Sequence, residues 1–250
     1  MTGTLILRLA APLQSWGIDS KYDVRRTGRE PSKSGVIGMI AAALGRGRDE
    51  SVEDLNRLRF GVRVEQEGVL LTDYHMVHKA SLKGNWQALM ADYDSDKMAD
   101  KEDSWQTRRD YLSDAVFLVG LEGDTELLQT ISDAVNAPVY PLFLGRRSCP
   151  PTLPINLGIR DAALLDALRF EPWRAGDEYL RKYAQETVAL RLIADAQSGE
   201  SGGGMRKDVP ASFASSWRRY GYRSAKDYGF VTLTVNRSDE TRHDVMAELR

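Results

Sequence analysis

A cationic loop that leads into an apolar helix is the first place in this sequence where residue types and spacing suggest chemistry. Between Lys21 and Arg48 seven lysines and arginines face only two acids, Asp23 and Glu30. We expect Ser34 to cap the helix that follows, because its hydroxyl can accept from free first-turn N–H groups, which also favour an anion. The segment therefore predicts a phosphate site, with an ordinary loop and helix cap as the alternative. Its candidate residues are Arg25, Arg26, Arg29, Lys33, Ser34, Gly35 and Arg46.

A second cationic loop, Gly145 to Cys149, follows the run Pro138 to Leu144, which we interpret as a strand. Glycine permits close approach of a ligand to the backbone, and paired guanidinium forks match phosphate oxygens. The candidate residues are Arg146, Arg147, Ser148 and Cys149. Two solvated arginines at a strand end are the alternative. If the predicted strand lies in the central sheet, this loop and the first one form a single groove.

A third cluster, Asp73 to Lys79, contains Tyr74 and His75. A metal-independent ribonuclease needs a base for the 2′-OH and an acid for the leaving oxygen, and His75 with Tyr74 or Lys79 could supply them. His75 and His78 lack the further ligands that a metal site requires. We favour a structural or RNA-contact role for this cluster over catalysis, and we predict no metal.

Two further stretches mix aromatic and basic residues, as surfaces that stack bases and pair phosphates do. One holds Trp105, Arg108, Arg109 and Tyr111, and the other runs from Arg206 to Lys226. Aromatic packing on the core and ordinary solvated surface are the respective alternatives. The sequence has no Walker loop, dinucleotide fingerprint or nucleophile elbow, so we expect no nucleotide cofactor.

The elements that must position these residues follow from hydrophobic periodicity. Alternation predicts strands, helical spacing predicts two main helices, and Asp124 is placed to cap the second. The predicted strands are 4–10, 60–64, 69–72 as the second arm of a hairpin, 115–121 and 138–144, and the main helices are 36–44 and 127–135. Strand, helix, strand, strand, helix, strand is the ferredoxin-like βαββαβ order of an α+β protein. Whether 69–72 or 115–121 is the third strand stays open.

The polar, charged stretch at about 78–110 is an insertion around the second and third strands, and it is too long for a simple hairpin loop, which indicates a functional extension. Past Arg160 the pattern changes to strands at 187–194 and 228–235, separated by a Gly-Ser-rich linker at 198–204. We therefore expect a first domain, 1–160, and a small β-rich C-terminal region, 161–250.

Composition excludes several classes of protein. The net charge of −2 does not by itself indicate a nucleic-acid partner, although six bases against one acid in Arg206–Lys226 make the basic surface local. Cys149 is the single cysteine, so an intrachain disulfide is excluded. No apolar run is long enough to cross a membrane, and the N-terminus does not resemble a signal peptide. A cytoplasmic protein is expected.

Taken together, these motifs resemble the CasD family of type I-E CRISPR Cascade subunits, of the RAMP superfamily. The resemblance covers about the first 160 residues and rests on five motifs in the family's order. They are L-I-L-R-L-A-A-P-L-Q-S-W-G from Leu5, the motif from Arg25 to Gly38, D-Y-H at Asp73, Y-L-S-D-A at Tyr111 and L-G-R-R-S-C-P from Leu144.

The resemblance implies a ferredoxin-like (RRM/RAMP-type) domain with a thumb, and a non-catalytic role. CasD-like subunits hold the 5′ handle of the guide crRNA, cap the filament of CasC backbone subunits and abut the large subunit CasA among the other Cascade subunits. Trp105 and Arg108 then lie where the thumb rejoins the domain, as contacts for handle bases. In related type I-C systems the equivalent subunit is itself the processing ribonuclease, so an endoribonuclease using His75 is the competing hypothesis.

Overall fold

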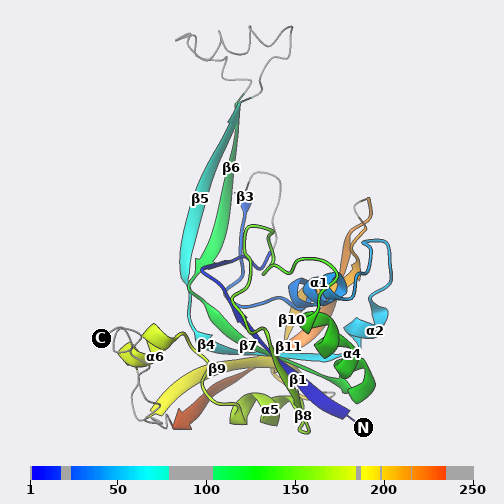
Figure 1. Cartoon of the computed structure of the whole chain (residues 1–250), viewed down its shortest axis with the longest axis vertical. Coiled ribbons are helices and arrows are strands. Elements are labelled where there is room, and N and C mark those ends of the chain that lie inside the picture. Colours follow the sequence, from blue (N-terminus) through cyan, green and yellow to red (C-terminus); the bar gives the residue numbers. More distant parts are fainter. Residues whose placement is uncertain are drawn as a thin grey trace, which may run out of the picture.

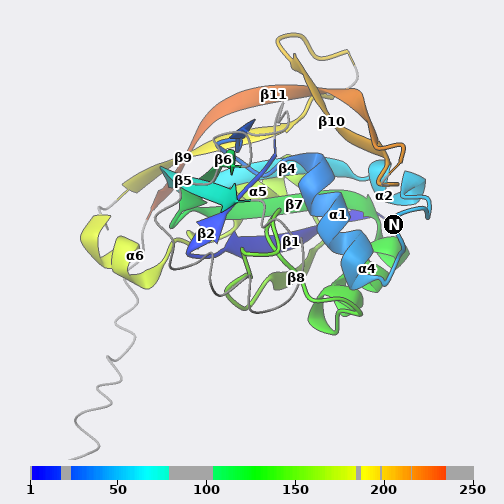
Figure 2. The same ribbon diagram turned by 90° about the horizontal axis from the view of Figure 1, so that it is seen from above.

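The structure is a computed structural model that describes residues 2–17, 24–78, 104–183, 187–197, 199–214 and 216–234. Its main feature is a seven-stranded sheet in the order β10-β11-β9-β4-β7-β1-β8 (Figures 1 and 2). The strands are β1 (Thr2–Ala10), β4 (Arg59–Gln66), β7 (Val116–Asp124), β8 (Asn156–Arg160), β9 (Thr187–Asp195), β10 (Gly204–Ser212) and β11 (Arg219–Thr234). All recorded pairings in this sheet are antiparallel. The chain is thus mixed α+β, with mostly antiparallel strands.

Helices cover both faces of this sheet, so its central strands are buried on both sides. Leu5, Leu7 and Leu9 of β1 join the larger core, to which α1 (Lys33–Ala43) and α4 (Thr125–Asn136) contribute. Ile6, between them, packs on the opposite face with α5 (Leu164–Phe170). Alternating side chains explain how one strand serves both cores. Asp124 caps α4 by accepting from the N–H groups of Glu126 and Leu127, as predicted.

The predicted strand at 138–144 is wrong, because this segment is irregular loop. Pro138 and Pro141 have no N–H with which to enter a ladder. The strand that pairs with the outer edge of β1 is β8, with Leu5 opposite Ile159. The loop is nevertheless fixed to the sheet side of the molecule, because Leu144 is buried and its carbonyl accepts from the N–H of Ser15.

A second, smaller sheet is built on β6 (Ser104–Ser113), which pairs with β2 (Leu13–Gln14), β3 (Val24–Arg25) and β5 (Val69–His78). The predicted hairpin between 60–64 and 69–72 is therefore wrong, since Val69 pairs with Ser113 of β6 and not with β4. A four-residue apolar run does not specify its partner. In Figure 1 β5 and β6 form a long ribbon that stands away from the main sheet. Most of the predicted thumb, 79–103, lies outside the described residues.

The C-terminal strands extend the main sheet. Strand β9 pairs with β4 through Gly61 opposite Ala194, and β11 and β10 follow outward. At the expected linker, the carboxylate of Glu200 accepts from Lys226 and Tyr228 of β11, and Gly204 already belongs to β10. Two short helices, α2 (Glu53–Asn56) and α6 (Asp177–Tyr183), complete the described elements. None of the described helices has the length and apolar character needed to cross a membrane.

Candidate functional site

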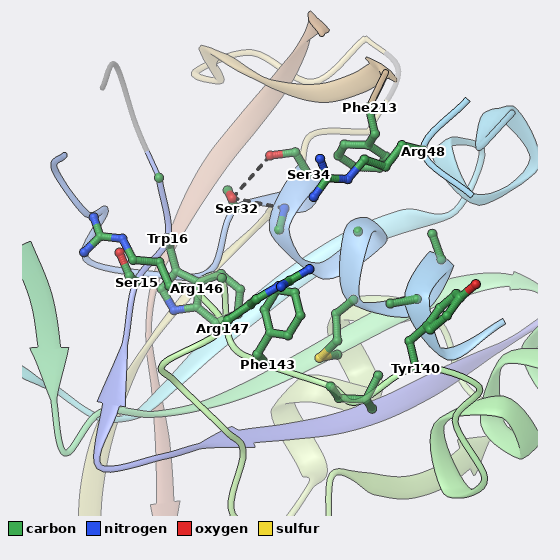
Figure 3. Close-up of a pocket in the computed structure, with 18 of the residues that line it drawn as sticks. Ser15, Trp16, Ser32, Ser34, Arg48, Tyr140, Phe143, Arg146, Arg147 and Phe213 are labelled. Atoms are coloured by element: carbon green, nitrogen blue, oxygen red, sulfur yellow. Dashed lines mark hydrogen bonds between the residues drawn. The ribbon is translucent and has the colours of Figure 1, made fainter. Parts of the chain in front are cut away.

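A cleft of about 1100 Å³ lies beside α1, between the loop 138–150 and the connection from β10 to β11. In Figure 3 Arg48 and Phe213 lie near α1, and Phe143, Arg146 and Arg147 face them from the loop. No aspartate or glutamate of the described ranges lines this cleft. Its arginines are Arg25, Arg46, Arg48, Arg146, Arg147 and Arg218.

The two predicted cationic loops meet at this cleft because both are bonded to the segment that follows β2. Ser15 donates its N–H to the carbonyl of Leu144 at 3.1 Å. Its neighbour Trp16 donates to the hydroxyl of Thr27 at 2.8 Å and accepts from the N–H of Gly28 at 2.6 Å. The expectation that both loops border one groove is thus fulfilled, although no strand at 138–144 brings them together.

Gly145 makes the closest of these approaches possible. Its φ is +88°, and a Cβ placed on it would lie 1.6 Å from the carbonyl oxygen of Ser15. An alanine would therefore suffer both left-handed strain and a backbone collision. Because Gly145 has no side chain, two backbone segments of the protein can contact each other at the base of the cleft.

Arg146 is tied down by the protein. Its guanidinium donates to the carbonyl oxygens of Asp110 at 3.0 Å and Arg25 at 2.8 Å, and it lies 4.6 Å from the ring centroid of Tyr111. These contacts join the 145–149 loop to β3 and β6. Arg147 is exposed and makes no hydrogen bond or ion pair with another described residue. Of the two adjacent arginines, Arg146 is therefore bonded to protein groups, whereas the guanidinium of Arg147 has no partner among the described residues.

The other arginines divide in the same way. Arg46 forms a bidentate pair with Asp54, at 2.6 and 2.5 Å, and this pairing raises the pKa of Arg46. The exposed side chains of Arg25, Arg48 and Arg218 have no such partner among the described residues. Arg26 and Arg29 are exposed on the same loop as Arg25 but do not line the cleft. Four arginines that line the cleft thus have no ionic partner in the described part of the chain: Arg25, Arg48, Arg147 and Arg218.

The start of α1 differs from the prediction. Ser32, not Ser34, is the N-cap, and its hydroxyl accepts from the N–H of Gly35. The N–H of Lys33 donates to the carboxylate of Asp208 at 2.9 Å, so the helix N-terminus already holds an anion supplied by β10. The phosphate seat expected there is occupied by the protein's own carboxylate. Ser34 and Gly35 still line the cleft.

The side chain of Lys33 lies inside the protein instead of on the loop surface. The residue is 4% exposed, and its ammonium donates to the carbonyl of Leu58 at 2.7 Å and to Asp195 at 3.2 Å. Burial lowers the pKa of Lys33, and the charge of Asp195 opposes this shift. Arg223 joins Asp195 to Asp208, which completes a buried network between α1 and the C-terminal strands.

Ser148 and Cys149 do not line the cleft. Cys149 is fully buried in the larger core, and this burial raises the pKa of its thiol. The hydroxyl of Ser148 lies 3.5 Å from that of Tyr111. Neither position adds a cation or an exposed nucleophile to the site.

The third predicted cluster lies on β5, away from the cleft lining. His75 and Asp73 share one face of the strand, with Nε2 2.5 Å from the carboxylate. Tyr74 extends from the other face and pairs in register with Arg108 of β6. Trp105 pairs in register with Val77, and Lys79 lies outside the described residues. The described residues contain no group of three or more metal-ligating side chains.

Several lining residues were not among the sequence candidates. Trp16, Tyr140, Phe143 and Phe213 place aromatic rings around the arginines. Trp16 belongs to the quoted S-W-G motif and Phe143 directly precedes L-G-R-R, so proximity to a motif was the available signal for these two. Phe213 lies within the mixed aromatic and basic stretch Arg206–Lys226, which the sequence had indicated as a whole. The site thus combines cations with flat apolar surfaces, the groups that bind phosphates and bases.

Comparisons with known proteins agree on one family. A family model described as CRISPR-associated protein (Cas_Cas5) matches residues 4–226. The "CRISPR system Cascade subunit CasD" of Escherichia coli (strain K12) is 38% identical over 169 residues, which cover 65% of this chain and 74% of the relative.

Two solved structures are similar over nearly the whole chain. One, described as "CRISPR RNA-guided surveillance complex", has a TM-score of 0.74 and 31% sequence identity. The match covers 98% of this chain and 97% of the chain in that structure. The other, described as "Crystal structure of Cas protein", has a TM-score of 0.67 and 37% identity, covering 91% and 94%.

Proposed function

This chain belongs to the Cas5 family of CRISPR-associated proteins, and from that membership we propose that it is a non-catalytic, RNA-binding subunit of a Cascade antiviral surveillance complex. It grips the 5′ handle of the guide crRNA in the cleft. In the assembled ribonucleoprotein it caps the filament of CasC backbone subunits and lies next to CasA, in the cytoplasm.

The observation that carries this proposal is the unbalanced charge of the cleft. Four exposed arginines without ionic partners among the described residues converge on a cavity that no described acid lines. Such an arrangement favours a polyanion, and guanidinium groups bind phosphate oxygens in a bidentate manner. The aromatic rings of Tyr140, Phe143 and Phe213 suit unpaired bases, which stack on aromatic side chains. The expected ligand is therefore a bent single strand.

The proposal divides the predicted RNA-binding residues by role. Arg25 and Arg147, with Arg48 and Arg218 from the two predicted basic stretches, contact phosphates, while Ser34 and Gly35 form the cleft wall. Arg146, Arg46, Lys33 and Cys149 support the site through their contacts with protein groups. Arg26, Arg29, Tyr74, His75, Arg108 and Ser148 do not line the cleft. Their contacts with the handle, and that of Trp105, stay predictions.

We assign β1, α1, β4, β7, α4 and β8 to the ferredoxin-like βαββαβ domain of the RAMP type. The antiparallel order β4-β7-β1-β8, with α1 and α4 contributing to the same core, supports this assignment. The ribbon β5–β6 is inserted between the second and third of these strands and corresponds to the base of the thumb.

The test is to co-express the chain with its Cascade neighbours and a CRISPR array, then purify the complex and quantify its guide RNA. The double variant Arg25→Gln/Arg147→Gln is expected to lower guide RNA occupancy at least tenfold, since each charged hydrogen bond contributes about 1.5–3 kcal/mol. Arg57→Gln is the matched control, because Arg57 is an exposed arginine paired with Glu53 outside the cleft. Full occupancy in the double variant would show the proposal to be wrong.

The Asp73–His75 contact favours one second candidate, a metal-independent endoribonuclease that processes pre-crRNA. A carboxylate can orient a histidine base. However, Tyr74 lies on the opposite face of β5, so it cannot act with His75 on one scissile bond. Incubation of the purified chain with repeat RNA in EDTA tests this candidate. Cleavage that disappears in His75→Ala would establish it over the non-catalytic proposal.

A further inference from the structure

The connection from β10 to β11 presents a tryptophan at the rim of the cleft. Trp217 is 61% exposed, and the guanidinium carbon of Arg219 lies 3.3 Å from its ring centroid. Phe213 and Arg218, in the same short connection, line the cleft itself. The stacked pair of Trp217 and Arg219, which we call the rim pair, is thus directly continuous with the cleft wall.

The rim pair has the chemistry of a nucleic-acid contact. An arginine held over an indole ring keeps a large flat apolar surface ordered and carries a positive charge beside it. Asp208 is the only acidic residue between 205 and 222, and its carboxylate is already bonded to Arg223 and to the N–H of Lys33. No carboxylate of this segment therefore neutralises Arg218 or Arg219.

The direction of the rim pair follows from strand alternation. Arg219 and Arg223 are four residues apart on β11, so strand alternation places their side chains on the same face. The two register shifts in the β10–β11 pairing insert their extra residues in β10, so they leave the alternation along β11 unchanged. Arg223 faces α1, because it donates to the Asp208 carboxylate that accepts from the N–H of Lys33 at the start of this helix. Arg219 therefore extends on the α1 side of the sheet, and its chain neighbours Arg218 and Tyr220 both line the cleft, so the rim pair lies directly beside the lining.

Tyr222 provides an internal comparison. It is also 61% exposed and also has a cation near its ring, with Lys207 Nζ 5.8 Å from the centroid. Its parity is opposite to that of Arg223, so it extends from the other face of the same strand. Two aromatic–cation pairs of similar exposure thus lie on one hairpin. The rim pair adjoins the lining residues Arg218 and Tyr220 directly, whereas Tyr222 lies two residues beyond Tyr220.

We propose that the rim pair is a separate single-stranded RNA contact, at which the nucleotide leaving the cleft stacks its base on Trp217 and places a phosphate on Arg219. This inference rests on the proposed function, because it requires RNA in the cleft. A protein partner is less well matched, since the surface joins a cation-lined cleft and has no acidic side chain in its own segment. The rim pair lengthens the bound strand without adding sequence recognition, because every base can stack.

Length dependence of RNA binding tests this. The full chain is titrated with oligoadenylates of increasing length, from about 4 to about 16 nucleotides, the range covered by single-strand binding folds. Trp217→Ala is expected to weaken binding of the longer strands by roughly 5- to 100-fold and to leave the shortest that bind unchanged. Trp217→Phe should retain most of the affinity, and thermal unfolding verifies that each variant is folded.

Two control variants separate the possible failures. Arg147→Gln should weaken binding at all lengths, and Tyr222→Ala at none. If Arg147→Gln has its effect but Trp217→Ala has none, or acts equally at all lengths, the rim-pair inference is wrong and the proposed function stands. An equal effect of Tyr222→Ala also overturns the inference. If the wild-type chain binds no strand of any length, the proposed function fails and the inference fails with it.

Discussion

The guanidinium of Arg146 lies over the ring of Tyr111, with its central carbon 4.6 Å from the ring centroid. Together with the bonds to the carbonyls of Asp110 and Arg25, this contact fixes three separate chain segments at one side of the cleft. Arg147, one residue later, points its charge into the cleft without such ties. Arg146 is therefore held by protein groups, whereas Arg147 is available for the proposed contact with RNA.

Arg146→Gln is expected to lower the free energy of unfolding by about 2–4 kcal/mol, because it removes charged hydrogen bonds to two carbonyls and a cation–π contact. Arg147→Gln is expected to change stability by less than about 0.5 kcal/mol, as exposed substitutions do. Instead, it should reduce the slope of log K against log salt for single-stranded RNA by about 0.7. Urea titrations and RNA titrations at several salt concentrations measure these effects, and exchanged outcomes would contradict the assignment.

Gly145→Ala is expected to displace the cationic loop, because the new Cβ collides with the backbone of Ser15. The cost should exceed about 3 kcal/mol, and RNA affinity should fall with it. Gly229→Ala is the control, since Gly229 also has positive φ, +75°, but has open space around its Cβ position. It should cost only about 1–2 kcal/mol. Equal losses in the two variants would mean that the approach to Ser15 is unimportant.

Lys33→Met is expected to destabilise the fold by about 3 kcal/mol, because it leaves the buried carboxylate of Asp195 with Arg223 as its remaining cationic partner. The salt slope of RNA binding should stay unchanged, since the ammonium does not face the cleft. A loss of slope like that of Arg147→Gln, with normal thermal stability, would instead make Lys33 a phosphate contact.

Asp208 should make the fold sensitive to acid. Burial alone would raise the pKa of Asp208, but the hydrogen bonds and charge of Arg223 outweigh burial and hold this pKa below its usual value. A carboxyl with a lowered folded-state pKa stabilises the fold above its unfolded pKa, about 3.9, and loses this contribution as pH falls through the folded value.

Asp208→Asn should therefore be less stable than the wild type at neutral pH, by about 2 kcal/mol, with a gap that narrows below about pH 4. Thermal unfolding of both proteins across this range measures the gap. A gap that widens on acidification would contradict the assigned role of Arg223.

The sequence was informative wherever local pattern decides structure. The strands at 4–10 and 115–121 and the cap at Asp124 follow from periodicity and capping chemistry, and the structure has all three. The two cationic loops were also identified from composition alone. That they border one groove was expected for an incorrect reason, since a proline-containing loop, not a strand, carries Arg146.

The errors arose where distant residues decide. Lys33 belongs to a basic loop by sequence, but Asp195 and Asp208 lie 162 and 175 residues away and take its ammonium and its N–H. The partner of Val69 is likewise fixed by β6 and not by its neighbours. No local rule indicates such pairings, because a lysine or arginine that binds RNA cannot be distinguished in the sequence from one that binds a carboxylate of the same protein.

The carboxylate of Asp208 at the start of α1 has a consequence for biosynthesis. During translation α1 emerges early, whereas the carboxylate that binds its first N–H group and the Arg223 that holds this carboxylate emerge about 175 and 190 residues later. Closure of such distant contacts is slow relative to local folding. One wall of the cleft is therefore completed only after Arg223 has been synthesised, so a shorter nascent chain does not present the finished form of the proposed RNA site.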